Sequence, residues 1–357
     1  MNEYDFRTTK DQSVGLYNNN VNDIYHSSHG AFKESIEKFA LASCISNLAK
    51  QNSNLNILDI CYGIGYNSKT LLYLAKQANR SIKINITASE INEDLVLISP
   101  FVRDTIPSLD LHIFLMSKIF QQDKAKFNKI FKVLPKDIDA ICSYFSPHLL
   151  NYLTINNHSY SKCMASELFP ARLHNIYYKY ISKSINNSLE CNIYGNCSFN
   201  YASIDARQLV KKLNTFFDVV FLDAFTPQKD PTLWTYDFIK VLKSKLHSDS
   251  ILVTYSNSTP YRAALIELGF YVGKTIINGK QFGTVASLNN KLIRFPLDKF
   301  DIGLTKTTAG VTYKDPNLNL NRETLITNRE TEKSKSDRIA TSRYKKNFAK
   351  ETSINAN

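Results

Sequence analysis

An aspartate that directly follows a hydrophobic segment is the first residue of this chain to suggest chemistry. Residues 217–222 read Phe-Asp-Val-Val-Phe-Leu, and Asp223 comes next. A hydrophobic run without helical periodicity is typical of a buried strand. Ligands of open α/β sheets bind at the carboxyl ends of the strands. Asp223 is therefore a candidate catalytic residue, and the alternative interpretation is a cap for the next helix.

The loop after Asp223 has the composition of a segment built to hold one shape. It contains two prolines and, at its end, the single tryptophan of the chain, Trp234. Proline fixes the backbone and lowers the entropy lost on folding. The loop is therefore predicted to hold one shape beside Asp223, and the simplest interpretation of Phe225 and Trp234 is packing in the core.

A glycine turn upstream predicts a cofactor site. Residues 58–67 read Leu-Asp-Ile-Cys-Tyr-Gly-Ile-Gly-Tyr-Asn, a short strand that leads through the glycines into a helix. Glycines there let a ligand approach the backbone and the free N–H groups of the helix. A second strand over residues 82–89 ends at an acid placed to accept hydrogen bonds from a ribose. The predicted cofactor-binding residues of this region are Asp59, Gly63, Gly65, Asn67 and Glu90.

The residues around the turn also restrict the ligand. A dinucleotide site has a third glycine in its motif, whereas Gly65 is followed by Tyr66, Asn67 and Ser68. Asp59 would repel a pyrophosphate but suits a cationic sulfonium ligand such as S-adenosylmethionine.

A third acidic position follows the segment 197–202. Asp205 and Ala206 stand where such folds place an acceptor for the adenine amino group. The alternative is an ordinary N-cap, because Asp205 opens a helical pattern.

Four segments of the chain, in order, resemble the methyltransferase domain of the MnmC family, the tRNA 5-methylaminomethyl-2-thiouridine methyltransferases. The resemblance extends over roughly residues 55–315 and rests on the segments 58–67, 222–234, 254–270 and 279–287, with a late match at 311–316. It implies an α/β fold with the Rossmann-like sheet of class I S-adenosylmethionine-dependent methyltransferases. The irregular segment over about residues 96–195 is interpreted as a helical insertion in this sheet, and the pattern near the end of the sheet predicts a C-terminal β-hairpin.

The activity that the resemblance implies is N-methylation of tRNA. The acceptor would be the primary amine of 5-aminomethyl(-2-thio)uridine at the wobble position, which becomes 5-methylaminomethyl(-2-thio)uridine. Asp223 would hold the amine and help to deprotonate it. Phe225, Pro227 and Trp234 would form a dry wall for the flipped base. Lys280 would contact a phosphate or the base, and its alternative is a solvated surface lysine.

The resemblance further implies a stand-alone transferase that uses S-adenosylmethionine without FAD, because no second glycine-rich nucleotide motif occurs in the sequence. Upstream wobble-uridine enzymes would act on the same tRNA without stable contact. The chain departs from the family at Cys61 and Ile64, where glycine and threonine are usual. A catalytically degenerate RNA-binding module therefore remains an alternative. Others are a methyltransferase for another RNA or small-molecule amine, and an aminopropyltransferase.

Composition agrees with a polyanionic partner. The net charge is +12 and the pI about 9.2, which favours nucleic acid. Six cysteines without a Cys-x-x-Cys pair predict reduced thiols in the cytoplasm. His26 and His29 have no third ligand at suitable spacing, so we expect no metal. No run of 18 apolar residues occurs, so we expect no membrane association.

The expected organisation has three parts. A helix over 32–48 follows an amino-terminal arm, and residues 272–277 and 282–287 form a hairpin around Asn278-Gly279. The polar, basic tail is expected to be a mobile helix or disordered. The boundaries are 1–50 for the arm and helix, 51–300 for the methyltransferase domain with its insertion at about 96–195, and 301–357 for the extension.

Overall fold

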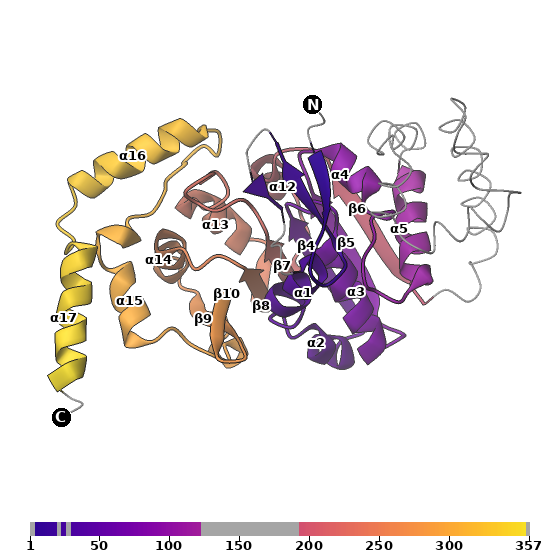
Figure 1. Ribbon diagram of the computed structural model, residues 1–357, viewed down its shortest axis with the longest axis horizontal. Coiled ribbons are helices and arrows are strands. Elements are labelled where there is room, and N and C mark those ends of the chain that lie inside the picture. The colour runs from indigo at the N-terminus through magenta and orange to yellow at the C-terminus, as the bar shows by residue number, and fades with distance from the viewer. Residues whose placement is uncertain (1–3, 20–22, 26–29, 123–192, 355–357) are drawn as a thin grey trace, which may run out of the picture. The chain divides into compact units, whose positions relative to one another are not determined.

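The computed structural model describes residues 4–19, 23–25, 30–122 and 193–354 (Figure 1). The chain divides into two compact units, Met1–Ser203 and Ile204–Asn357. Each unit is described by itself.

The first unit is built on a parallel sheet with the strand order β6-β5-β4. Its register pairs Ile60 with Ser89, and Ser89 with Ala202. The carboxyl ends of the three strands are therefore level, and the residues that follow them lie side by side. The strands are β4 (Asn54–Ile60), β5 (Lys83–Ser89) and β6 (Cys197–Ala202).

Helix α3 (Tyr66–Ala78) follows β4 directly and packs against the helical segment that precedes the sheet. That segment is not the single helix expected over 32–48. It consists of α1 (Ala31–Ser35), a π-helical turn η1 (Ile36–Ala40) and α2 (Ile45–Gln51). Cys44 has a φ of 55°, a left-handed conformation that interrupts a right-handed helix. The remaining helices described in this unit are α4 (Glu93–Ile98) and α5 (Leu109–Gln122).

The amino-terminal arm is an antiparallel meander of β1 (Tyr4–Thr8), β2 (Val14–Asn18) and β3 (Asp23–Ile24). The buried phenol oxygen of Tyr66, the first residue of α3, lies 2.8 Å from the Arg103 carbonyl and 3.1 Å from the Val14 carbonyl, which share its single hydrogen. The arm is thereby held at the start of the helix that follows the glycine turn.

The second unit carries the strand order β7-β8-β10-β9. Strands β7 and β8 are parallel, and β10 is antiparallel to both β8 and β9. Asn278 and Gly279 have φ of 50° and 75° between β9 and β10, so the hairpin predicted there is confirmed. The strands are β7 (Phe217–Leu222), β8 (Leu246–Thr254), β9 (Tyr271–Ile277) and β10 (Lys280–Ser287).

The second unit also contains helices, and two of them, α16 (Arg322–Ser334) and α17 (Thr341–Ile354), lie in the polar tail. An aromatic cluster of Phe300, Tyr344 and Phe348 joins α17 to α15. No helix among the described residues is both long and apolar enough to cross a membrane. The helices are α12 (Ala206–Lys212), α13 (Tyr236–Lys243), α14 (Thr259–Glu267), α15 (Lys299–Thr305), α16 (Arg322–Ser334) and α17 (Thr341–Ile354), with short 3-10 turns at Asn290–Leu292 and Thr308–Gly310.

Candidate cofactor and substrate sites

Asp59 is a fully buried carboxylate near the carboxyl end of β4. The Ser68 hydroxyl donates to its Oδ2 at 2.6 Å. Its Oδ1 is buried and accepts no hydrogen bond from any described residue. The pKa of Asp59 is raised to about 7, mainly by burial and also by the nearby charge of Glu90, while the hydrogen bonds from Ser68 oppose the shift. A buried acid with an unused oxygen favours a cationic group at this place.

The glycine turn between β4 and α3 consists largely of left-handed backbone. The φ angles are 65° at Cys61, 57° at Gly63 and 81° at Gly65. A Cβ on Gly65 would lie 2.2 Å from the Tyr62 phenol oxygen, so only glycine fits there. Cys61 adopts a conformation that a side chain disfavours by about 1–2 kcal/mol. The backbone at Cys61 therefore has the left-handed conformation that glycine adopts readily, and the cysteine side chain makes this conformation strained.

Glu90 ties the end of β5 to the glycine turn. Its Oε2 accepts the Gly63 N–H and its Oε1 accepts the Asn92 N–H, both at 2.9 Å. Burial raises the pKa of Glu90 despite these hydrogen bonds. A carboxylate offers about four acceptor positions, so Glu90 can hold the turn and still accept from a ribose.

The five cofactor-binding residues predicted in this region lie together in the first unit. Asn67, in the first turn of α3, is buried like its neighbours. The set offers an unpaired buried carboxylate oxygen, a second carboxylate, and backbone without side chains at Gly63 and Gly65. These features fit S-adenosylmethionine: a cationic ligand with a ribose that must lie close to the chain.

Asp205, in the second unit, forms the N-cap of α12. Its Oδ1 accepts the Arg207 backbone N–H at 2.8 Å, and its carboxylate pairs with the Arg207 guanidinium. The capping interpretation is therefore confirmed, and Ala206 beside it is buried. The role of this pair in binding adenine stays a prediction.

Asp223 follows β7 directly and begins a loop that side chains hold in place. The Tyr255 phenol donates to the Ala224 carbonyl at 2.8 Å, and the Trp234 indole N–H donates to the Phe225 carbonyl at 2.7 Å. Asp223 itself is half-buried. A carboxylate at the end of a buried strand, on a loop fixed at its next two residues, is suited to orient a substrate amine.

The structure favours the core-packing alternative for Trp234 over the expected contact with substrate. Trp234 is fully buried and lies edge-on against Tyr261, with ring centroids 4.9 Å apart. No face of the indole is open for a base to stack on, so Trp234 acts by holding the loop. Pro227 is also buried, whereas Phe225 is half-buried and remains a candidate contact.

Lys280 is exposed at the first residue of β10. This position agrees equally with a phosphate contact and with a solvated lysine, so its role stays a prediction.

Sequence reasoning missed a buried charged cluster beside the glycine turn. The Lys69 ammonium donates to the Ser99 carbonyl at 2.6 Å and lies 3.2 Å from Asp104, which also lies 3.4 Å from His112. Burial would raise the pKa of Asp104, but the charges of Lys69 and His112 hold it at about 2. The only signal in the sequence was Lys69, a charged residue near the start of a helix whose neighbouring residues are buried. The cluster therefore joins α3 to residues 99–112 of the first unit.

Metal binding finds no support within the part of the chain that the structure describes, where no group of three His, Cys, Asp or Glu residues is placed to hold an ion. His26 and His29 lie outside the described residues.

Comparison with known proteins shows which proteins this chain is similar to. Residues 170–289 match a family model described as S-adenosyl-L-methionine-dependent methyltransferase. The fold is similar to that of MnmC2 from Aquifex aeolicus, with a TM-score of 0.62 and 23% identity over 94% of this chain and 87% of that one. The likeness in structure shows the expected Rossmann-like class I fold, and the family match over residues 170–289 supports an S-adenosylmethionine-dependent methyltransferase.

Within this class the chain is similar to the MnmC proteins, so the predicted resemblance is confirmed. It is 38% identical over 66 residues to the tRNA 5-methylaminomethyl-2-thiouridine biosynthesis bifunctional protein MnmC of Burkholderia vietnamiensis, a match spanning 18% of this chain and 10% of that protein. An uncharacterised protein of Methanocaldococcus jannaschii is 28% identical over 334 residues, 92% of this chain and 72% of that protein.

Proposed function

We propose that this methyltransferase acts on the primary amine of 5-aminomethyl(-2-thio)uridine at the wobble position of tRNA. The proposal is carried by Asp223 on its fixed loop, which falls within the matched residues 170–289. The likeness to MnmC proteins, named for biosynthesis of a tRNA nucleoside, supports the choice of substrate. A substrate of this kind also argues for a cytoplasmic enzyme.

The residues named above have separate roles in this proposal. Asp59, Glu90 and the glycine turn hold S-adenosylmethionine, which supplies a methyl group activated by its sulfonium. The acceptor nitrogen forms the new bond to carbon while the carbon–sulfur bond breaks. Only the neutral amine has a free electron pair for this attack, so Asp223 binds the ammonium form, orients it and takes its proton.

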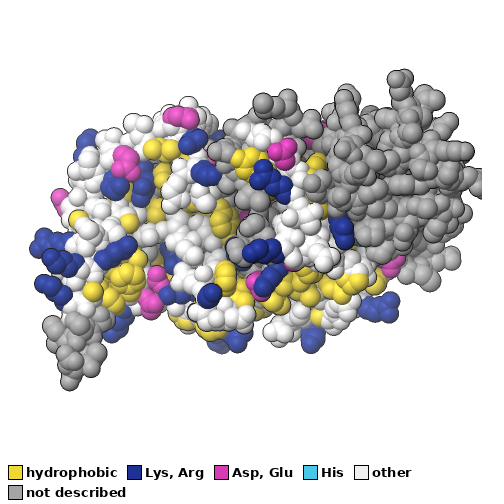
Figure 2. Space-filling model, in the orientation of Figure 1, with side chains coloured by type: hydrophobic (Ala, Val, Ile, Leu, Met, Phe, Trp, Pro, Cys, Tyr) yellow, Lys and Arg dark blue, Asp and Glu magenta, His cyan; other side chains and the backbone are white. Residues whose placement is uncertain are grey.

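Basic side chains in the second unit support tRNA as the partner. Arg343, Lys345 and Lys346 on α17 are exposed, and lysines and arginines gather on this helix (Figure 2). The net charge of +12 acts in the same direction. Phosphate neutralisation by such residues contributes affinity that is independent of sequence.

The decisive experiment is methyl transfer to defined tRNA. The purified protein is incubated with S-adenosylmethionine and with tRNA from a strain that lacks the wobble methyltransferase, and the nucleosides are analysed by mass spectrometry. We expect the aminomethyl nucleoside to gain one methyl group at its amine. Cofactor binding without any conversion of this tRNA would contradict the proposed acceptor.

A further inference from the structure

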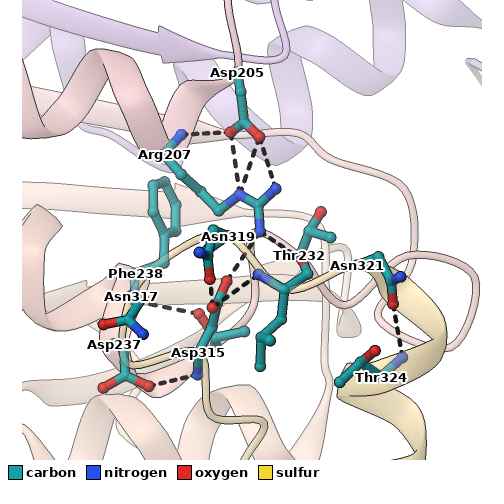
Figure 3. A network of polar contacts seen from close by, with 12 residues as sticks. Asp205, Arg207, Thr232, Asp237, Phe238, Asp315, Asn317, Asn319, Asn321 and Thr324 are labelled. Atoms are coloured by element: carbon teal, nitrogen blue, oxygen red, sulfur yellow. Dashed lines mark hydrogen bonds and ion pairs between the residues drawn. The ribbon is translucent and has the colours of Figure 1, made fainter.

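The Arg207 guanidinium binds the carboxylate of Asp205 through its Nε and Nη2 atoms. Its Nη2 donates to Oδ2 at 2.7 Å, and its Nε is shared between Oδ1 and Oδ2 at 3.2 and 3.1 Å (Figure 3). The same residue also donates its backbone N–H to Oδ1. Asp205 is therefore fixed in one orientation by its own neighbour in the helix.

Arg207 is itself held by a segment more than 100 residues further along the chain. Its Nη1 donates to Asp315 Oδ2 and to the Leu320 carbonyl, both at 2.9 Å. Asp315 is fully buried, and its other oxygen accepts the backbone N–H groups of Asn319 and Leu320 at 3.0 and 3.1 Å. The Asp315 N–H donates to Asp237 at 2.6 Å. The guanidinium is thus clamped between the carboxylates of Asp205 and Asp315 (Figure 3).

The clamp leaves Asp205 with capacity for one more donor. Three hydrogens reach its carboxylate from the described residues: one from the backbone and two from the guanidinium. A carboxylate offers about four acceptor positions. The Asp205 side chain is also 32% exposed, whereas its partner Asp315 is wholly enclosed. The exposed carboxylate therefore has one acceptor position to offer a ligand.

We propose that Arg207 and Asp315 are positioning residues that aim the free acceptor of Asp205 at the adenine amino group of the cofactor. This inference rests on the proposed cofactor role of Asp205. It assigns residues 315–320 an indirect part in cofactor recognition. Neither residue touches the cofactor in this scheme, since Arg207 acts on Asp205 and Asp315 acts on Arg207.

If Arg207 and Asp315 only stabilised the fold, another contact between α12 and the carboxyl-terminal segment would affect ligand binding in the same way. The chain offers a matched control in Lys211, also on α12, whose ammonium donates to the Asn317 carbonyl at 2.8 Å. Lys211 thus joins the same helix to the same carboxyl-terminal segment through a separate hydrogen bond. A variant at Lys211 therefore weakens the docking of the segment but leaves the Asp205 clamp in place.

The experiment compares two ligands that differ only in the substituent on carbon 6 of the base. S-adenosylhomocysteine carries the amino group, and its 6-deamino analogue, with unsubstituted purine as the base, carries a hydrogen atom there that forms no comparable hydrogen bond with a carboxylate. Calorimetry gives the ratio of their dissociation constants for the full chain and for Arg207→Lys, Asp315→Asn and Lys211→Gln. Circular dichroism checks that each variant is folded, and Arg207→Lys and Asp315→Asn test the clamp independently.

We expect the unaltered protein to prefer the adenosyl ligand by about tenfold or more, the effect of one well-placed hydrogen bond. Arg207→Lys and Asp315→Asn should reduce the preference to about threefold or less, and Lys211→Gln should keep it. An undiminished preference in either folded clamp variant would overturn the inference, as would no preference in the unaltered protein.

The outcomes also separate this inference from the proposed function. Equal binding of both ligands together with tRNA methylation would overturn the adenine assignment and this inference and would leave the proposed function standing. A tenfold preference that disappears in the clamp variants, together with failure to methylate tRNA, would support the inference and overturn only the proposed acceptor. Failure of both ligands to bind would overturn the cofactor assignment and the inference with it.

Discussion

Asp59 should make cofactor binding depend on pH near neutrality. Burial raises its pKa from 3.8 to about 7, so the carboxyl is largely protonated below pH 7 when no ligand is bound. A cationic cofactor favours the ionised form. We therefore expect S-adenosylmethionine affinity to fall by up to about tenfold per pH unit below 7. Calorimetry between pH 5.5 and 8 in two buffers should also show proton release on binding.

Asp59→Asn is the control for this prediction, because it should bind weakly with little pH dependence. An affinity of the unaltered protein that is flat across this range would contradict it. The same raised pKa acts on stability with a definite sign. The folded state binds more protons than the unfolded state between about pH 4 and 7, so this residue's contribution to stability falls as pH rises through that range and is constant above it.

Cys61 is strained at a position where the conformation suits glycine. Its φ of 65° predicts that Cys61→Gly increases the free energy of unfolding by about 1 kcal/mol, measured by urea denaturation. Cys44→Gly is a matched control, because Cys44 has a φ of 55° outside the glycine turn. Both changes should stabilise, but only Cys61→Gly should alter S-adenosylmethionine affinity. Destabilisation by Cys61→Gly would show that its thiol contacts outweigh the strain.

Asp223 should matter for the methyl-transfer step and little for cofactor binding. Asp223→Asn retains the shape of the side chain but removes the charge that orients and deprotonates the amine. We expect kcat to fall by about 100-fold or more, with the Kd for S-adenosylmethionine changed by less than about threefold. Asp218→Asn is a control on the same strand, because Asp218 bonds His247 at 3.0 Å instead. Equal losses in both variants would argue against the assigned role.

At the scale of elements, the side chains of Trp234 and Tyr255 hold the first residues of the loop after β7 by hydrogen bonds to their carbonyls. Trp234→Phe removes the donor to the Phe225 carbonyl and leaves a gap in a fully buried site. We expect a loss of about 1–3 kcal/mol in the free energy of unfolding, together with a fall in kcat larger than the change in cofactor Kd. Thermal denaturation and single-turnover assays measure the two effects.

Tyr255→Phe tests the same idea with a smaller change. It removes only the hydroxyl that donates to the Ala224 carbonyl and keeps the ring that packs near Trp234. A fall in kcat with little loss of stability would separate loop positioning from packing. Unchanged kcat in both folded variants would mean that the hydrogen bonds do not position Asp223.

At the scale of the whole molecule, the excess of positive charge is partly presented by α17. One face of the helix packs through Tyr344 and Phe348 onto Phe300, which leaves Arg343, Lys345 and Lys346 exposed. Replacement of these three by glutamine should weaken tRNA binding and reduce its dependence on salt. The log–log slope should fall by about 0.9 for each phosphate that the protein no longer neutralises. Filter binding between 50 and 250 mM salt measures this.

A second set of exposed lysines provides the control for α17. Glutamine at Lys299, Lys306 and Lys314 removes the same net charge from other parts of the second unit, and it should change the slope less. Cofactor affinity should be unaffected by either set. Equal effects of the two sets would show that overall charge, rather than α17, attracts the tRNA.

Features that depend on residues close together in the chain followed from the sequence alone. The glycine turn into α3, the Asn278-Gly279 hairpin and the position of Asp223 after a buried strand were all predicted. Each rests on a local rule: left-handed φ for glycine or asparagine, or hydrophobic continuity for a buried strand. The acids after successive strands are an equally local signal, and they correctly indicated the α/β class.

Tertiary structure decided what depends on burial and on partners remote in sequence. Trp234 is fully buried and packs edge-on against Tyr261, so it supports the loop, and Asp205 is held by Arg207, which also bonds Asp315, 110 residues from Asp205. The pKa of Asp59 was equally invisible in the sequence, because desolvation is set by everything packed around the carboxyl. Sequence pattern therefore located the chemical groups, whereas packing determined which of them face a ligand and in which charge state.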